Sequence, residues 1–434
     1  SGRMALGGSL TGVFLGFSGT EFTQVLALSP AGGSVYAATG STASIASGRL
    51  SYVLDMHGPC ITSDTACSAA LAACHAGLRA LQRCECTAGL TMGVTLMLAP
   101  SVGTGFAVAG MTSSRGRSHT FDARADGYAR GEACGGVSTR RGEGGMELCL
   151  HGSAVRQDGR SASLTAPNGQ AQQALLVAAL ADAGFSASEL VLNEAHGTGT
   201  ALGDPIELGS LVGAVLAARE APLTVSGVKA TIGHAEPAAG MTGLLKLALG
   251  LQRGDAAPNA QLRLLNPHVR GGLRGVACAL PVQLVASVAH GCSAGGVSSF
   301  GYSGTIVHAV LATRSAGRSL GGSSAAASRA LLLYRRRDFR WRDAPHPFAQ
   351  HRLLSSDGGD AILRSPASGA LHQHVADHVV QRRIIFPAAG YLAMARAACC
   401  SRVASSATGA SLLDVFFLQP LVVEVPGLYV DCVL

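Results

Sequence analysis

Residues 64–70 read DTACSAA and place one cysteine, Cys67, between a strand-like run and a run of small residues. The second run predicts a helix over residues 68–81, because its leucines stand at helical spacing and small residues fill much of the circumference. A helix of this kind packs inside a protein rather than on its surface. At the start of a helix, free backbone N–H groups and the positive end of the dipole favour a thiolate. Cys67 is therefore a candidate nucleophile, with a lowered thiol pKa expected.

The rest of residues 1–312 predicts a layered α/β domain. Apolar strand-like runs alternate there with Ala/Leu-rich helical runs, which is typical of a sheet covered by helices. Residues 11–17 are predicted as a buried strand, and residues 241–251 as a second internal helix. Residues 285–288 and 305–311 are predicted as strands that flank a glycine loop.

Composition and net charge bear on whether the chain spans a membrane, binds nucleic acid or carries a signal peptide. The 434 residues are 48% hydrophobic, and no apolar stretch reaches the roughly 18 residues that a membrane-spanning helix needs. The net charge is +7, but no long basic run is interleaved with aromatic residues, so nucleic-acid binding is disfavoured. The chain begins Ser-Gly-Arg, without an initiator Met or a signal-peptide pattern. We therefore expect an internal piece of a longer, cytoplasmic polypeptide, with a plastid location left open.

The twelve cysteines are expected to be mostly buried, reduced thiols. Their neighbours are mostly small or apolar, and the chain offers no secretory signal. Cys84 and Cys86 lack a second pair of ligands at zinc spacing, so no metal site is expected. A structural role is the expectation for eleven of the cysteines, and Cys67 is the exception because of its companions.

Two histidines provide those companions. His196 lies in EAHGTGT, residues 194–200, and His234 ends KATIGH, residues 229–234. A neutral imidazole can donate a hydrogen bond to a thioester oxygen on which negative charge develops, and two such donors can hold one oxygen. A cysteine with two histidines therefore forms a constellation for acyl transfer, whereas either histidine alone would be assigned a structural role.

The three motifs, with Cys67, His196 and His234 in this order along the chain, resemble the ketosynthase domain of type I modular polyketide synthases. Three further segments carry the same resemblance: TASIASGRLSY (42–52), FDARADGYARGE (121–132) and GSAVRQDGRSASLTAPN (152–168). The resemblance covers residues 1–312 and implies a thiolase-like ketosynthase fold of α-β-α-β-α layers, without the family's first strand–helix units. It implies that Cys67 accepts the growing chain as a thioester. The two histidines, His196 and His234, are implied to assist decarboxylation of a malonyl-type unit and to stabilise the enolate.

The resemblance assigns further site residues. Lys229 matches the family's lysine in the loop before the second histidine, where a cation favours a thiolate; a surface lysine is the alternative. Thr198 and Thr200 match positions whose hydroxyls contact the phosphopantetheine arm. Asp204 and Glu207 are expected to shape the loop rather than to do chemistry.

A late glycine-rich loop completes the resemblance in this region. SSFGYSGT, residues 298–305, matches the family's loop, in which the backbone N–H of Tyr302 is implied to form an oxyanion hole with that of Cys67. The side chains depart from the pattern, since Tyr302 stands for a phenylalanine, Ser303 for a glycine and Ile306 for an asparagine. Backbone donors survive side-chain changes, so the hole is expected to persist.

The C-terminal part is a separate region. Residues 313–344 are predicted as a linker, because much of this stretch is rich in Ser, Gly and Ala. Residues 345–434 resemble the start of a polyketide synthase dehydratase, a partial α+β hot-dog domain, with β-like runs such as residues 421–425. His378 matches that family's catalytic base, with Arg382 where the family has glycine. The acid partner is implied to belong to a second half that follows, so dehydration by this chain alone is not expected.

The leading hypothesis is a β-ketoacyl synthase, an acyltransferase that joins a Cys-bound acyl chain to a malonyl-type unit by decarboxylative Claisen condensation. A fatty-acid synthase condensing domain and a non-elongating module that only holds or passes an acyl chain are the alternatives. The resemblance implies an acyl carrier protein bearing 4′-phosphopantetheine as partner, no cofactor bound directly, and a homodimer in the intact synthase. No acyltransferase domain separates the two regions, which is the order of synthases whose acyltransferase acts in trans.

Overall fold

The computed structural model describes residues 6–142, 148–217, 219–286, 293–313, 346–353, 362–402, 411–424 and 427–434. The chain divides into two compact units, one before and one after residues 314–345 in the sequence. The predicted linker, residues 313–344, lies outside the described residues except for Thr313.

The first unit contains two sheets, of which the first has four strands in the order β2-β1-β3-β4. β1 is parallel to both of its neighbours, and β4 runs antiparallel at the edge. The sequence of β1, TGVFLGF, is a run with few polar residues, and the strand is buried along nearly its whole length. The strands are β1 (Thr11–Phe17), β2 (Cys60–Ser63), β3 (Ala88–Thr95) and β4 (Ala133–Arg140).

The second sheet of this unit has six strands in the order β5-β12-β11-β6-β7-β9. It is mixed, because β11 runs antiparallel to β12 and parallel to β6. β11 is buried at every position and lies in the middle of the sheet. The strands are β5 (Leu148–Gln157), β6 (Leu190–Glu194), β7 (Leu223–Ser226), β9 (Cys278–Ala279), β11 (Ala294–Phe300) and β12 (Thr305–Thr313).

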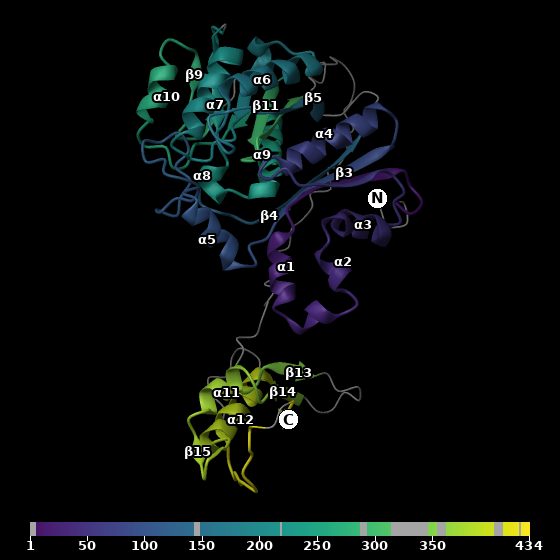
Figure 1. Ribbon diagram of the computed structural model, residues 1–434, viewed down its shortest axis with the longest axis vertical. Coiled ribbons are helices and arrows are strands. Elements are labelled where there is room, and N and C mark those ends of the chain that lie inside the picture. Colours follow the sequence, from purple (N-terminus) through teal and green to yellow (C-terminus); the bar gives the residue numbers. More distant parts are fainter. Residues whose placement is uncertain are drawn as a thin grey trace, which may run out of the picture. The chain divides into compact units, whose positions relative to one another are not determined.

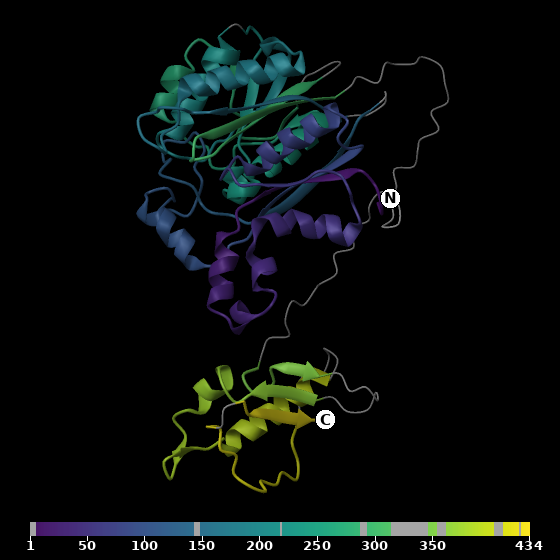
Figure 2. The same cartoon turned by 45° about the vertical axis from the view of Figure 1, so that its right-hand side comes forward.

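Two helices, α4 (Ala69–Gln82) and α9 (Ala239–Arg253), lie between the two sheets (Figures 1 and 2). Small residues permit this close packing on both sides of α4. A Cβ atom on Gly16 of β1 would lie 2.6 Å from the carbonyl carbon of Ala69, so only glycine lets this strand reach the helix. The apolar side chains of both helices and of the facing strands form one buried cluster.

Helices also cover the outer faces of the sheets. α3 (Ala43–Leu54) packs on β1 and β2, and α6 (Gly169–Ala183) packs on β5 and β12. The layers therefore follow the order α-β-α-β-α, which is the predicted fold class. α6 begins where the side chain of Asn168 accepts two helical N–H groups, and it ends at Gly184 with a φ of 70°.

Shorter elements connect the layers of this unit. The helices are α1 (Thr20–Ala27), α2 (Ala37–Ser41), α5 (Pro100–Val108), α7 (Gly203–Leu211), α8 (Lys229–Ile232) and α10 (Pro267–Gly272). Single turns of 3₁₀ or π-helix occupy Pro30–Gly33, Ala187–Glu189, Val212–Leu216 and Glu236–Ala238. β8 (Asp255–Ala256) and β10 (Val285–Ala286) form a two-residue antiparallel pair.

The second unit is a small α+β fold. An antiparallel sheet in the order β13-β14-β17 and two helices enclose an apolar core that includes Leu371, Phe386 and Met394. The elements are β13 (His351–Leu353), β14 (Ile362–Pro366), α11 (Ala370–Val375), β15 (Val379–Val380), β16 (Arg383–Ile384), α12 (Ala388–Arg402) and β17 (Tyr429–Val433). This unit agrees with the expected α+β segment.

Most of the expected elements are confirmed, and two expectations need correction. β1, α4, α9 and β12 match the predicted strands and helices. Of residues 285–288, only 285–286 are in a strand, and residues 287–288 lie outside the described residues. The β-like run at 421–425 is wrong for its described part, where Val422 alone forms a single bridge to Ile385. Ile385 lies just after the two-residue strand β16, which pairs with β15, and the three-stranded sheet of this unit has β17 at its edge.

The described cysteines and helices can be compared with two expectations, that the cysteines are mostly buried and that no stretch is long and apolar enough to span a membrane. The ten cysteines whose side chains the structure describes are all free, but Cys60, Cys84 and Cys134 are exposed rather than buried. Cys60 and Cys134 lie in the outermost strands of the first sheet, and Cys84 stands between two charged residues just after the end of α4, which accounts for their exposure. Within the described residues, every helix is too short or too polar to cross a membrane.

Candidate functional site

Cys67 occupies a tight turn between β2 and α4. The preceding residue, Ala66, has a φ of 53°, a left-handed conformation that costs energy for any residue with a side chain. The Ser299 hydroxyl of β11 donates to the carbonyl oxygen of Cys67 at 2.7 Å, and the Thr65 and Ser68 hydroxyls lie 2.8 Å apart. The turn therefore holds the thiol at a fixed place, two residues before the first residue of α4.

The structure brings His234 into contact with this thiol and His196 beside His234. Nε2 of His234 lies 3.0 Å from Sγ of Cys67, and the His234 ring is fully buried. The His196 ring centre lies 5.6 Å from that of His234, with the two rings perpendicular. The backbone N–H of Phe300 donates to Nδ1 of His196 at 3.2 Å. Because Nδ1 accepts, the proton of a neutral His196 resides on Nε2, which is then a hydrogen-bond donor.

Lys229 is buried at the start of α8 and explains part of the electrostatics. Burial first, and then the Lys229 charge, hold the pKa values of His196 and His234 well below the ordinary histidine value. Both imidazoles are therefore neutral at physiological pH. Burial also lowers the pKa of Lys229 itself, against the raising effect of nearby carboxylates. The alternative of a surface lysine is wrong.

The expectation of a lowered thiol pKa is also wrong. Burial, with the Glu236 carboxylate as the next contribution, raises the pKa of Cys67 to about 12. Lys229 and the backbone amides of Tyr302 and of Cys67 itself act in the opposite direction, but desolvation outweighs them. The resting group is therefore a thiol in contact with a neutral imidazole, rather than a preformed thiolate.

The two amides predicted for an oxyanion hole converge on the same atom. Hydrogen-bond contacts from the backbone of Tyr302 and of Cys67 stabilise charge on Sγ of Cys67. The phenol ring of Tyr302 is 46% exposed and meets Phe106 edge-on at 6.3 Å. Ile306, the residue in the asparagine position, is fully buried in the core of the second sheet. The side-chain departures thus lie in an aromatic contact and in the core, while the backbone donors remain.

Asp204 and Glu207 shape the loop that carries His196, as predicted. Glu207 accepts the N–H groups of His196 and Gly197 at 2.6 and 2.8 Å. Asp204 accepts the N–H groups of Phe121 and Gly199 at 2.7 and 3.0 Å. Burial raises the pKa of Asp204 to about 6 and that of Glu207 to about 7. Each carboxylate is consumed by backbone donors, which is a positioning role.

Thr198 and Thr200 lie on this same loop, between His196 and α7. Their hydroxyl oxygens are 3.3 Å apart, and the Thr200 hydroxyl also accepts the N–H of Gly203 at 3.1 Å. Neither threonine lines the cavity that adjoins Cys67. The structure therefore groups the threonines with the histidine loop rather than with the walls of the cavity.

A cavity of about 340 Å³ adjoins Cys67 and contains residues that sequence reasoning missed. Its walls include Tyr128, Arg130, Glu236 and Glu21, and the Tyr128 ring contacts that of His234 edge-on at 4.8 Å. Two signals could have found them. Tyr128 and Arg130 belong to the matching segment 121–132, and Glu236 follows His234 by two residues.

His378 belongs to the second unit and has its own surroundings. The residue is exposed, and its Nδ1 lies 2.7 Å from the carbonyl oxygen of Ile385. Arg382, in the glycine position, has a φ of 66°, which is the conformation that glycine adopts most easily. The turn between β15 and β16 thus keeps a glycine-like geometry at the cost of backbone strain. Among the described residues of either unit, no group of three His, Cys, Asp or Glu side chains could hold a metal ion.

Comparisons with known proteins agree with this geometry. Residues 2–142 match the β-ketoacyl synthase N-terminal domain, residues 148–263 the β-ketoacyl synthase C-terminal domain, and residues 346–431 the polyketide synthase dehydratase domain. The spectinabilin polyketide synthase system protein NorC of Streptomyces orinoci is 41% identical over 317 residues, covering 70% of this chain and 14% of that protein. Erythronolide synthase EryA2 of Saccharopolyspora erythraea is 39% identical over 313 residues, covering 71% and 9%.

Solved structures show the same fold. The ketosynthase from module 6 of the bacillaene synthase from Bacillus subtilis 168 aligns with a TM-score of 0.67 and 30% identity, covering 72% of this chain and 56% of that one. The chain thus spans about a seventh or less of the two curated relatives named above and about half of this structure. Residues 2–263 belong to the β-ketoacyl synthase family, as ketosynthase sequence of a modular polyketide synthase, and residues 346–431 belong to the polyketide synthase dehydratase domain.

Proposed function

We propose that the first unit catalyses decarboxylative Claisen condensation of an acyl chain on Cys67 with a malonyl-type unit on an acyl carrier protein. The observation that carries this proposal is the 3.0 Å contact between Sγ of Cys67 and Nε2 of His234, beside a second neutral histidine and two convergent amides. A buried thiol with these four partners has little structural purpose, because apolar packing would stabilise the same position without them.

Acylation is the first step. Sγ of Cys67 attacks the thioester carbonyl while its proton passes to Nε2 of His234, which removes the cost of a buried free thiolate. The amides of Cys67 and Tyr302 hold the oxyanion of the tetrahedral intermediate. The bond to the pantetheine sulfur then breaks, and the proton leaves with that thiol. His234 returns to its neutral form.

Condensation is the second step. Before this step the neutral His234 moves its proton from Nδ1 to Nε2, which nothing opposes because Nδ1 has no hydrogen-bond partner among the described residues. The Nε2 protons of His196 and His234 then hold the thioester oxygen of the malonyl unit, so that loss of CO₂ leaves an enolate in place of a free carbanion. The enolate carbon attacks the Cys67 thioester, a carbon–carbon bond forms, and the bond to Sγ breaks. Nε2 of His234 gives its proton to the departing Sγ, and the ring takes one proton from solvent at Nδ1, which restores the resting thiol and imidazole. Lys229 keeps both imidazoles neutral throughout, and Thr198 and Thr200 are proposed to contact the phosphopantetheine arm.

The wider assignments belong to the same proposal. The partner is an acyl carrier protein with 4′-phosphopantetheine, the intact synthase is a homodimer in the cytoplasm, and malonyl units come from an acyltransferase acting in trans. For the second unit, we propose that His378 is the base of a dehydratase half-site. The Nδ1 contact with a carbonyl oxygen leaves Nε2 as the atom that removes a proton.

The first experiment tests acylation. The 434-residue chain is incubated with acyl carrier protein bearing an acyl thioester, and the adduct is measured by intact-protein mass spectrometry. We expect one adduct that Cys67→Ala abolishes and that Cys74→Ala, a fully buried cysteine of α4 outside the cavity, leaves intact. An equal adduct on Cys67→Ala would reject the assignment.

The second experiment separates condensation from mere acyl holding. Decarboxylation of malonyl carrier protein should fall at least about a hundredfold in His234→Ala and in His196→Ala, because each removes a donor to the enolate oxygen. His57→Ala, an exposed histidine outside the cavity, is the control and should match the wild type. Acylation without decarboxylation in the wild type would favour the non-elongating module, and the fatty-acid alternative would be favoured by exclusive use of saturated acyl chains.

A further inference from the structure

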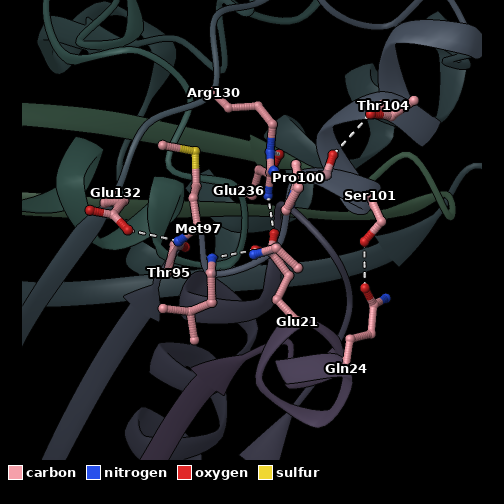
Figure 3. A network of polar contacts seen from close by, with 12 residues as sticks. Glu21, Gln24, Thr95, Met97, Pro100, Ser101, Thr104, Arg130, Glu132 and Glu236 are labelled. Atoms are coloured by element: carbon pink, nitrogen blue, oxygen red, sulfur yellow. Dashed lines mark hydrogen bonds and ion pairs between the residues drawn. The ribbon is translucent and has the colours of Figure 1, made fainter. Parts of the chain in front are cut away.

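A charged network links the Cys67 cavity to helix α1 (Figure 3). The guanidinium of Arg130 donates to both carboxylate oxygens of Glu236, from Nε at 2.7 Å and from Nη2 at 2.9 Å. The same Nη2 lies 2.6 Å from Oε1 of Glu21, in the first turn of α1. All three side chains line the cavity, and each is about one-tenth exposed. The Arg130 guanidinium therefore pairs with two carboxylates in a largely buried environment.

Neighbouring elements hold this network in one geometry. Oε2 of Glu21 accepts the N–H groups of Leu98 and Ala99 at 2.5 and 2.9 Å, just before α5. The Arg130 guanidinium lies over the Phe106 ring of α5 at 5.5 Å, and this is the ring that contacts Tyr302. Removing one member of a buried, bidentate group leaves an unpaired charge, which is costly.

The main chain around Arg130 also holds the segment that carries His234. The N–H of His234 donates to the Ala129 carbonyl at 2.6 Å, and the N–H of Gly131 donates to the His234 carbonyl at 2.9 Å. Two residues beyond His234, Glu236 has a φ of 39°, a strained conformation for a residue that is not glycine. The bidentate pair with Arg130 is what keeps this strained residue in place.

The charges of the network act on both reacting groups. The Glu236 carboxylate raises the pKa of Cys67, and the Arg130 charge lowers the pKa of His234. Burial first, and then the charges of Cys67 and Glu236, raise the pKa of Tyr128, while the Arg130 charge lowers it. The groups that face the Cys67–His234 pair are Glu236, Lys229, His196, Tyr128, Tyr302 and Arg130.

We infer that Arg130 is a positioning residue that acts through Glu236 and the His234 segment: it neutralises the carboxylate beside the nucleophile and holds the histidine at the thiol. The inference rests on the proposed role of Cys67 as nucleophile. It is tested by alkylation, a reaction that needs no carrier protein. The network also gives α1 a function, because Glu21 anchors Arg130 from outside the catalytic loops.

The experiment measures the rate at which iodoacetamide alkylates Cys67 in the full chain between pH 6 and pH 10, by peptide mass spectrometry. Cys60, which is exposed and outside the cavity, is the internal control in every sample. Glu236→Gln should displace the Cys67 profile by about one unit toward lower pH, which is roughly a tenfold rise in rate at pH 8. Arg130→Gln should displace it by about one unit in the opposite direction.

The double variant Arg130→Gln/Glu236→Gln decides between positioning and simple structural damage. Neutralising the carboxylate should return the profile to within a few tenths of a unit of the wild type, whereas a damaged fold would not be rescued. If Arg130→Gln fails to fold, Glu236→Gln and Glu21→Gln still decide, since the carboxylate nearer to Cys67 must give the larger displacement. Identical profiles for the wild type and for Glu236→Gln would overturn the inference. Failure of carrier-dependent acylation with these displacements intact would reject the proposed function alone.

Discussion

Replacing Gly16 by alanine tests the contact on which the layered architecture depends. The added Cβ would lie 2.6 Å from the Ala69 carbonyl carbon and closer still to the amide of Ala70, whereas ordinary contact begins near 3.4 Å. β1 and α4 must therefore separate by at least about 0.8 Å, and both elements are packed on their other sides as well. Overpacking of a rigid core costs about 1–3 kcal/mol, and backbone atoms on one side of the clash place this case at the upper end. We expect a loss of about 3 kcal/mol.

The assay is urea unfolding of the full chain, followed by circular dichroism at 222 nm, together with the rate of Cys67 acylation. Gly48→Ala is the matched control, because Gly48 is also a glycine of the first unit, lies within α3, and has open space where its Cβ would be. Alanine should stabilise α3 there by about 0.5–1 kcal/mol through helix propensity. Acylation should slow in Gly16→Ala, since α4 follows Cys67 directly, and stay unchanged in Gly48→Ala. A Gly16→Ala chain within about 0.5 kcal/mol of the wild type would refute the packing argument.

Three further predictions follow from single contacts. Burial raises the pKa of Glu207, so between about pH 4.5 and pH 7 the folded chain keeps a proton that the unfolded chain has lost. The free energy of unfolding should therefore fall as the pH rises through this range, by up to about 1.4 kcal/mol per pH unit. Urea titrations should show a flatter pH dependence for Glu207→Gln, and an unchanged slope would contradict the assignment. Leu371→Ala should destabilise the second unit by about 2–5 kcal/mol, because the side chain is fully buried in that unit's apolar core; a loss below about 1 kcal/mol in urea unfolding would contradict this packing. Ser299→Ala should slow acylation of Cys67 several-fold and lower the free energy of unfolding by about 1 kcal/mol, because the Cys67 carbonyl oxygen loses its hydrogen-bond donor. An unchanged acylation rate would show that the turn around Cys67 keeps its geometry without this hydrogen bond.

Much of the fold was predictable because the decisive patterns are local. The run of small residues after Cys67 predicts a helix that fits between two sheets, and α4 has the predicted limits to within one residue. The β-like run at 421–425 is wrong for its described part because strand formation needs a partner: Val422 alone forms a bridge, to Ile385, just beyond the two-residue strand β16. Partner length is a property of the assembled sheet rather than of the segment.

The candidate site, like the fold, is predictable where its signals are local in sequence and unpredictable where they depend on the folded chain. His196, His234 and Lys229 stand in distinctive local motifs, and the structure brings all three to Cys67 or its immediate surroundings. The direction of the Cys67 pKa shift was mispredicted, because the start of a helix is visible in sequence whereas the depth of burial is not. Glu21 escaped notice because its partner Arg130 is 109 residues away in the chain, a pairing that only the folded layers create.

The hydrogen bond from Ser299 to the Cys67 carbonyl joins residues that are 232 positions apart. During synthesis, at about 5–20 residues per second, some ten to fifty seconds separate the emergence of these two residues from the ribosome. Throughout that interval the nucleophile turn lacks both β11 and the Phe300 amide that orients His196. The thiol is thus made early and its catalytic surroundings late, so a nascent chain carries the reactive residue long before it can hold an acyl group productively.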